Sequence, residues 1–326
     1  SSAASDVYKR QDGVRCECIG PRFVVQRLIV PPHTSCYYRC PICLRGDIGT
    51  CDAVITIGIV LRFRGNVLVS EQANVDCAAG FGVRLIGCAD DAALPIGMHD
   101  YAEALGCCTL VDKTMFIADV LDCDASVVVC CRPEGFGKSM NLSTLRAFLE
   151  RPAVGRADQR LFANAQIWDA DGGRYRDEYA CYPVISLDFS GAARRGAAIA
   201  DVVRDALSGE CARLLALLEA PDLARDKVRH IERVARGVAS ADEVDSVLGV
   251  LIELLEMACD EQVVLLVDGY DAAWSRRASA RDASDADPAG LFDRVLFDAI
   301  ATARDSLRLT CLMGECPGPA EAALSS

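Results

Sequence analysis

Apolar positions beyond residue 95 alternate between short continuous runs and helical spacing. The runs Ser126–Cys131, Tyr182–Phe189 and Val263–Val267 are short and bounded by turn or charged residues, which predicts buried strands. Between them, apolar residues recur every three or four positions, as on the buried face of an amphipathic helix. We expect helices over 142–149, 203–218 and 244–255. Strands that alternate with helices predict an α/β fold with a mostly parallel sheet.

The first 94 residues follow neither pattern. Their apolar bursts are short, broken by Gly, Pro and Cys, and show no sustained helical period. This stretch carries a net charge of +1, whereas residues 95–326 carry −14. We therefore expect a boundary near Asp90–Pro95, with an irregular, Cys-rich segment before it that need not be a domain and one α/β domain after it.

Composition excludes several classes of protein. The chain has 326 residues, of which 52% are hydrophobic and 25% charged, as in a globular protein. The longest apolar run, Val54–Leu61, stops at Arg62, far short of the ~18 residues that a membrane helix needs. A net charge of −13 gives no electrostatic reason to bind nucleic acid or anionic lipid. The first residues lack a secretory signal, so we expect an intracellular, cytoplasmic protein.

Eighteen cysteines allow two interpretations. Many of the ten beyond residue 94 lie in apolar runs, where a reduced cysteine packs as a small hydrophobe. One cluster is tighter: Cys36, Cys40 and Cys43, with His33 and Cys51 nearby. Thiolates at this spacing could hold zinc, and unliganded thiols are the alternative.

The segment after Cys131 predicts a phosphate-binding loop. A strand, a glycine-containing loop that ends in Gly137-Lys138-Ser139, and a helix follow one another. Backbone N–H groups and the helix dipole would face the phosphates, Lys138 would add a charge, and the Ser139 hydroxyl would ligate Mg²⁺. The predicted nucleotide-binding residues are Arg132, Pro133, Glu134, Gly135, Phe136, Gly137, Lys138 and Ser139. Because Arg132 stands where the usual motif has glycine, the pattern alone leaves a plain strand-to-helix turn open.

A second element predicts the other half of such a site. The run Val263–Val267 ends at Asp268, and an aspartate there could position Mg²⁺ opposite Ser139. The alternative is a carboxylate that merely caps a buried strand. The roles of two further residues stay open. Asp188 ends another strand and Lys113 precedes a helix, so each could reach the nucleotide or serve only local structure.

Six motifs then occur in one order: Leu94–Met98, Val111–Thr114 with Phe116, Arg132–Ser139, Leu142–Leu145, Tyr182–Ser190 and Val267–Asp271. Over residues 94–317 this order resembles the predicted AAA-ATPase-like family, whose loop typically reads Arg-Pro-Arg-Arg-Phe-Gly-Lys-Thr/Ser. The resemblance implies a three-layer P-loop NTPase core, Mg-ATP as ligand, and hydrolysis that drives a conformational switch. Family members often carry a restriction-nuclease-like domain after this core.

Three departures from the family fall on its chemistry. Glu134-Gly135 replaces the loop's arginine pair, and Gly269 replaces the glutamate that would activate water. Met313 stands where the resemblance implies a polar γ-phosphate sensor. General-base catalysis is worth about 10²–10⁴ in rate, so binding is expected to survive while hydrolysis is impaired. Asp271 is a possible substitute for the missing base.

The resemblance also implies that the domain is incomplete. Its sheet is expected to stop after the fourth core strand, without a fifth strand, a lid or the nuclease. The leading hypothesis is an ATP-binding protein that acts on an unknown protein partner or on a further carboxyl-terminal domain. Whether it hydrolyses ATP stays open. The alternatives are a non-enzymatic scaffold that keeps the fold and, on weaker grounds, a metal-binding module at Cys36–Cys51.

Overall fold

The computed structural model describes residues 53–55, 59–61, 63–64, 67–68, 84–87, 95–123, 125–133, 135–153, 155–193, 198–272, 288–316 and 320. Before residue 84 these are four short strands that form two antiparallel pairs. Their bounds are β1 Ala53–Ile55, β2 Ile59–Leu61, β3 Phe63–Arg64 and β4 Val67–Leu68. The predicted zinc ligands Cys36, Cys40 and Cys43 lie outside the described residues.

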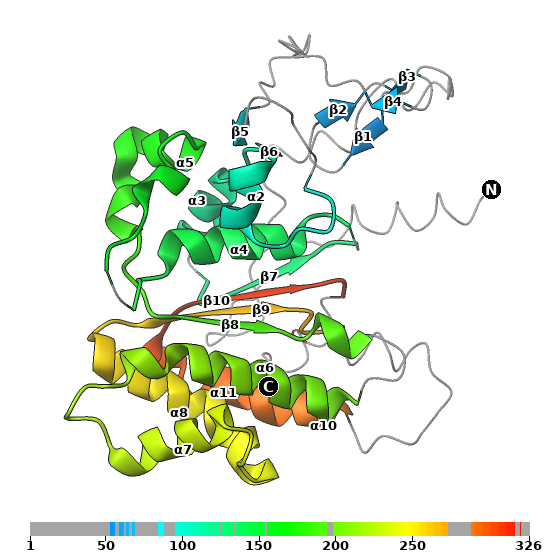
Figure 1. Ribbon diagram of the computed structural model, residues 1–326. Coiled ribbons are helices and arrows are strands. Elements are labelled where there is room, and N and C mark those ends of the chain that lie inside the picture. The colour runs from blue at the N-terminus through cyan, green and yellow to red at the C-terminus, as the bar shows by residue number, and fades with distance from the viewer. Residues whose placement is uncertain are drawn as a thin grey trace.

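A four-stranded parallel sheet forms the centre of the fold (Figure 1). Its order is β7-β10-β9-β8, so strands far apart in sequence lie side by side. The strands are β7 Val127–Cys131, β8 Val184–Asp188, β9 Val263–Asp268 and β10 Leu307–Gly314. Every residue of β7 and β9 is buried, as expected for parallel strands with helices on both faces. The predicted strands are confirmed.

Helices cover both faces of the sheet. On one face lie α2 Tyr101–Cys107, α3 Met115–Leu121, α4 Lys138–Leu149 and α5 Gln166–Asp169 (Figure 1). On the other lie α6 Ile199–Leu214, α7 Arg225–Ala235, α8 Ala241–Cys259, α10 Pro288–Phe292 and α11 Asp298–Thr302. A π-helical turn, Asp293–Phe297, joins the last two, and 3₁₀ turns lie at Gln159–Leu161, Ala170–Glu178, Ser190–Ala193, Leu215–Leu217 and Arg304–Ser306.

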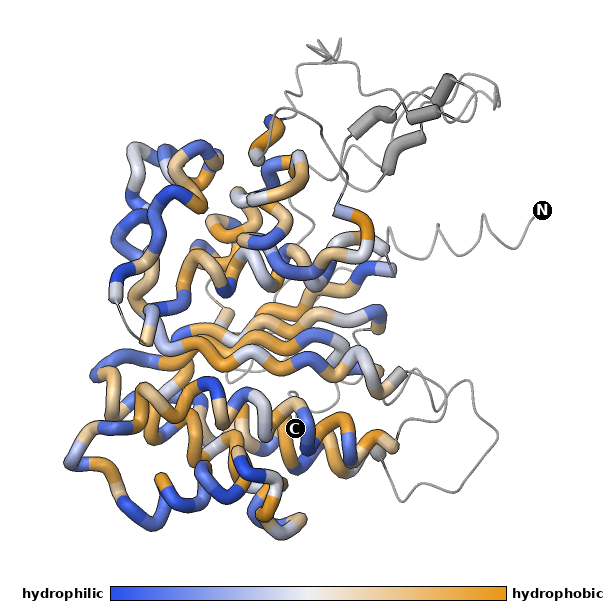
Figure 2. Tube along the Cα trace, in the orientation of Figure 1, coloured by the Kyte–Doolittle hydropathy of each residue, from blue (hydrophilic) through white to orange (hydrophobic). Residues whose placement is uncertain are grey.

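Alternate strand residues feed two hydrophobic cores. Val128, Val264 and Leu266 point to the core beneath α4, whereas Val129, Leu265 and Val267 point to the core beneath α6 and α8. Figure 2 shows the apolar residues concentrated in the sheet and along the helix faces that cover it. This is the predicted three-layer α/β arrangement with a parallel sheet, and it is confirmed.

The start of α8 follows directly from its sequence. The Ser240 hydroxyl accepts a hydrogen bond from the Glu243 amide, and the Glu243 carboxylate accepts one from the Ser240 amide. This reciprocal pair is the capping box that Ser240 and Glu243 predict. Among the described residues, no helix combines the length and apolar character needed to cross a bilayer.

A short strand pair crosses the expected boundary near residue 94. Strand β5, Leu85–Gly87, runs antiparallel to β6, Thr109–Val111, and Ile86 is buried in the core beneath α4. Residues 85–87 therefore pack with the segment that follows them. The division of the chain at residue 94 stays a prediction.

Candidate functional site

The carboxyl ends of the sheet strands bring the predicted residues together. Because the four strands are parallel, β7, β8, β9 and β10 all end at the same edge. In the strand register Asp188 lies opposite Asp268, which lies opposite Met313. The loop 132–137 leaves this edge from Cys131 and leads into α4. The edge thus places polar side chains from β8 and β9 next to the start of α4.

Two glycines allow the loop to turn into α4. Gly135 has φ +80° and Gly137 has φ +74°, the left-handed region in which side chains are strained. Gly137 is the N-cap residue of α4, and among the described residues no side chain forms a hydrogen bond with this helix end. Its first N–H groups are therefore available to an anion, which the helix dipole also favours. Glu134 lies outside the described residues.

Lys138 extends back over its own loop. Its Nζ donates to the carbonyl oxygen of Arg132 at 2.9 Å and to that of Pro133 at 3.1 Å. It also lies 3.6 Å from a carboxylate oxygen of Glu315, and its side chain is 14% exposed. The ammonium thus lies on the loop at the sheet edge, and an incoming phosphate would compete with Glu315 for it.

Ser139 and Asp268 meet in a direct hydrogen bond. The Ser139 hydroxyl, in the first turn of α4, donates to an Asp268 carboxylate oxygen at the end of β9. Asp268 is buried. Burial raises its pKa, Asp188 adds to that rise, and the Ser139 hydrogen bond and Lys138 oppose it. Desolvation therefore disfavours the ionised carboxylate, and a divalent cation beside it would offset this penalty.

These two oxygens fit a magnesium site of the kind that phosphates complete. Mg²⁺ prefers hard oxygen ligands and usually takes only one or two from the protein, the rest coming from water and phosphate. A hydroxyl and a carboxylate that already touch are such a pair. Within the described ranges, no group of three or more His, Cys, Asp or Glu side chains could hold a metal ion without further ligands.

The remaining predicted loop residues take different positions. The guanidinium of Arg132 donates to the carbonyl oxygen of Cys131 at 2.9 Å, and its backbone N–H donates to Gly314 at 3.0 Å. Arg132 therefore joins the loop to the end of β10. Pro133 and Gly135 are exposed, and Phe136 is 44% exposed. None of these four loop residues forms a hydrogen bond with Asp268.

Lys113, whose role the sequence did not decide, lies beside the loop. A Cβ atom built on Gly137 would be 3.0 Å from the Lys113 Nζ. The lysine is half-buried, and its partial loss of hydration lowers its pKa to about 7. The structure thus places a second amine at the loop. From the Val111–Thr114 motif alone, a contact of Lys113 with the loop was only one of two possibilities.

The backbone conformation and close neighbours of Gly269 restrict which residue can stand at this position. Gly269 has φ +67°, and a Cβ there would lie 2.7 Å from the Ser190 backbone nitrogen. Its N–H donates to the carbonyl oxygen of Met313 at 2.8 Å. A glutamate could not occupy this position without a backbone shift. Met313 itself is buried in the core beneath α4, so its side chain offers no polar group to a ligand.

Asp271 is engaged with backbone amides. One carboxylate oxygen accepts from the Glu315 N–H at 2.8 Å and from the Cys316 N–H at 2.6 Å, and the residue is buried. Tyr270 assists by donating from its hydroxyl to the Cys316 carbonyl oxygen at 2.5 Å. These contacts favour a structural role for Asp271, which fixes the chain after β10.

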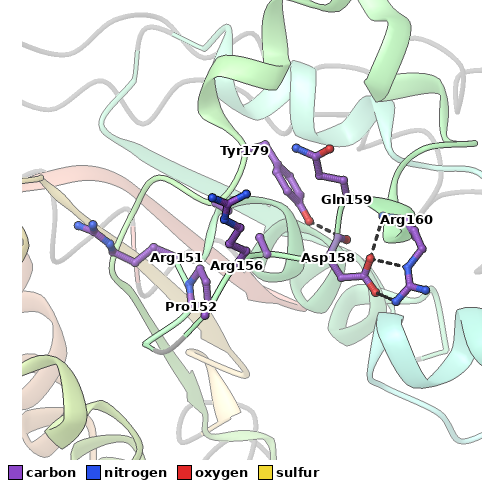
Figure 3. A pocket seen from close by; sticks show the side chains of 10 residues that line it. Arg151, Pro152, Arg156, Asp158, Gln159, Arg160 and Tyr179 are labelled. Carbon is purple, nitrogen blue, oxygen red and sulfur yellow. Dashed lines mark hydrogen bonds and ion pairs between the residues drawn. The ribbon is translucent and has the colours of Figure 1, made fainter.

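A separate hollow of about 620 Å³ lies at the other end of α4 (Figure 3). Arg151, Arg156 and Arg160 line it, with Asp158 paired to Arg160 at 2.8 Å. The Arg151 N–H donates to the Tyr182 carbonyl oxygen just before β8 begins, which places the hollow at the amino edge of the sheet. It is therefore remote from the Ser139–Asp268 pair.

Comparison with known proteins gives one result. The family model described as Predicted AAA-ATPase matches residues 95–317, more than half of the chain. No curated protein and no solved structure matches.

Proposed function

Because the chain belongs to the predicted AAA-ATPase family, we propose that its α/β domain binds Mg-ATP on the loop 132–139 and hydrolyses it slowly. The observation that carries this proposal is the contact between Ser139 and Asp268 beside Lys138. Two elements 129 residues apart thus supply a hydroxyl and a carboxylate next to an uncapped helix start. A protein that uses ATP works where ATP is made, so the proposal includes an intracellular location.

Each residue has a distinct part in binding. The first N–H groups of α4 hold phosphate oxygens, and Lys138 leaves its loop carbonyls and Glu315 to neutralise the β- and γ-phosphates. Ser139 and Asp268 hold Mg²⁺, which, when bound, neutralises phosphate charge. Gly135 and Gly137 let the backbone approach the phosphates without a side chain between them.

Slow hydrolysis follows from three side chains. Position 269 has no group that could orient or deprotonate water, and the buried Asp271 carboxylate is occupied by two backbone amides. Met313 supplies no polar contact to a γ-phosphate. Without a positioned base, the rate is expected to be about 10²–10⁴ below that of an intact site.

One observation favours a second candidate, a non-enzymatic scaffold. Lys138 already has two carbonyl oxygens and a carboxylate around it, so the loop is satisfied without a ligand. On this view the loop is retained as architecture and the domain binds partners without nucleotide. The two candidates differ in whether Mg-ATP stabilises the fold.

The test is thermal unfolding of the full chain with and without Mg-ATP. A ligand at 100 times its dissociation constant stabilises by about 2.7 kcal/mol, which for a domain of this size is a rise of roughly 5 °C in Tm. Lys138→Ala should weaken binding ~30-fold, because it removes a charge-assisted contact worth about 2 kcal/mol. At the same ATP concentration we therefore expect the stabilisation to fall to about 0.9 kcal/mol, roughly a third of the original shift in Tm.

Two variants control for charge. Arg156→Ala removes a cation from the hollow at the amino edge and should keep the full shift. Glu315→Gln removes only the carboxylate that pairs with Lys138 and should bind at least as tightly as the original chain. An unshifted Tm in the original chain, or an equal shift in Lys138→Ala, would favour the scaffold.

A further inference from the structure

Lys113 occupies an unusual place for a lysine. It follows β6 and precedes α3, and its Nζ extends to the start of α4, 3.0 Å from where a Gly137 Cβ would lie. Gly137 thus leaves the space that the amine fills. Gly137 directly precedes Lys138, so the Lys113 amine lies near the residue that begins α4. The two lysines reach the loop from different elements, Lys113 from the β6–α3 connection and Lys138 from the first turn of α4.

The amine has no partner within the part of the chain that the structure describes. There, the Lys113 Nζ makes neither a hydrogen bond nor an ion pair. The adjacent carboxylate of Asp112 is directed elsewhere: it accepts from the Thr114 hydroxyl at 2.6 Å and from the Gln166 N–H at 2.6 Å. Because Lys113 is half-buried, its ammonium is partly desolvated without a counter-ion, and an anion on the loop would relieve that cost.

Among the residues that the structure describes, no charged neighbour supplies that anion. The described elements next to Lys113 carry these charged residues on them or at their ends: Arg84, Asp100, Glu103, Asp112, Asp119, Asp122, Arg132, Lys138, Arg146, Asp169 and Glu315. Burial, rather than any of these charges, lowers the Lys113 pKa to about 7. Without ligand, a large fraction of the protein therefore carries a neutral amine at this position near pH 7.

We propose that Lys113 is a second phosphate-binding residue of the site, which contacts the polyphosphate chain of the nucleotide alongside Lys138. This role rests on the proposed function and adds a cation that reaches the ligand from outside the loop. The ligand class is a polyphosphate, because the amine lies at the loop and at the first turn of α4.

Binding should then be coupled to a proton. A bound polyphosphate favours the ammonium form of Lys113, so the complex takes up a proton that the free protein lacks above pH 7. Affinity is expected to fall by up to about tenfold for each pH unit above this value. Below it Lys113 is already charged, and its own contribution to the pH dependence should vanish.

The experiment is calorimetric titration of the full chain with Mg-ATP at pH 7.5 and 8.5, above the ~6 at which a phosphate group takes its second proton. Two buffers of different ionisation enthalpy report proton uptake. We expect the original chain to bind about tenfold more weakly at pH 8.5 and to take up close to one proton. Lys113→Gln should bind roughly tenfold more weakly at pH 7.5, with no proton uptake and little dependence on pH.

Two further variants make the result specific. Lys113→Arg keeps a permanent charge and should bind without the pH dependence. Lys227→Gln removes a lysine that pairs with Glu253 on the opposite face of the sheet, and should titrate like the original chain. Circular dichroism confirms folding, and the pH response of the original chain tests the proposal even if Lys113→Gln fails to fold.

The outcomes separate this proposal from the proposed function. If Lys113→Gln binds as tightly as the original chain and takes up the same proton, Lys113 is not a ligand, although nucleotide binding stands. An original chain whose affinity is equal at pH 7.5 and 8.5, with no proton uptake, also overturns the proposal. If the original chain binds no nucleotide at all, both proposals fail.

Discussion

The Gly269→Glu variant is expected to lose about 3 kcal/mol of unfolding free energy and to hydrolyse ATP no faster than the original chain. A residue other than glycine at φ +67° costs ~1 kcal/mol, and the Cβ would also overlap the Ser190 backbone at 2.7 Å. The added carboxylate would therefore start from a displaced backbone. Urea unfolding and a phosphate-release assay measure the two effects.

Gly249→Ala is the matched control. Gly249 lies within α8, and a Cβ there would meet nothing within 4 Å. Because alanine favours a helix over glycine, this change should stabilise by about 0.5–1 kcal/mol. A Gly269→Glu protein that is as stable as the original chain and hydrolyses ATP much faster would show that the backbone at 269 readily accommodates the catalytic residue.

The Asp271→Ala variant is expected to lose about 3 kcal/mol of unfolding free energy. It removes a buried carboxylate that accepts from the Glu315 and Cys316 amides, and hydrogen bonds to a charged group are worth about 1.5–3 kcal/mol each. Asp271→Asn keeps an oxygen acceptor and should lose less. Chemical denaturation of the three proteins gives the differences.

A control and a second readout decide between the two roles of Asp271. Asp298→Ala changes an exposed carboxylate on α11 and should stay within ~0.5 kcal/mol of the original chain. If Asp271→Ala unfolds at the original denaturant concentration but loses the residual hydrolysis, Asp271 is the substitute base rather than a structural residue.

The layers of the fold were predictable because their signals are local. Buried strands such as Val263–Asp268 are continuous apolar runs, and the capping box at Ser240 fixes the start of α8. The β5–β6 pair was missed because strands of three residues have too few positions to show a period. Helix α7 was also missed, although Ile231 and Val234 lie on its buried face.

Only part of the candidate site could be anticipated. Ser139 and Asp268 could be expected to meet, since the carboxyl ends of parallel strands share one edge. The ion pair of Lys138 with Glu315 depends on how the chain leaves β10, which no local pattern encodes. Likewise the positive φ of Gly269 and the amide contacts of Asp271 are properties of the folded backbone. Sequence could name these residues but could not assign what they touch.

Magnesium dependence tests most directly whether Ser139 and Asp268 form half of a nucleotide site. ATP is titrated into the full chain with Mg²⁺ and again with excess EDTA, and the titrations are repeated with Asp268→Asn. The account predicts one saturable site, at least about tenfold tighter with Mg²⁺ in the original chain, and a much smaller difference in the variant. Equal affinities with Mg²⁺ and EDTA in the original chain, or no saturable binding in either, would contradict it.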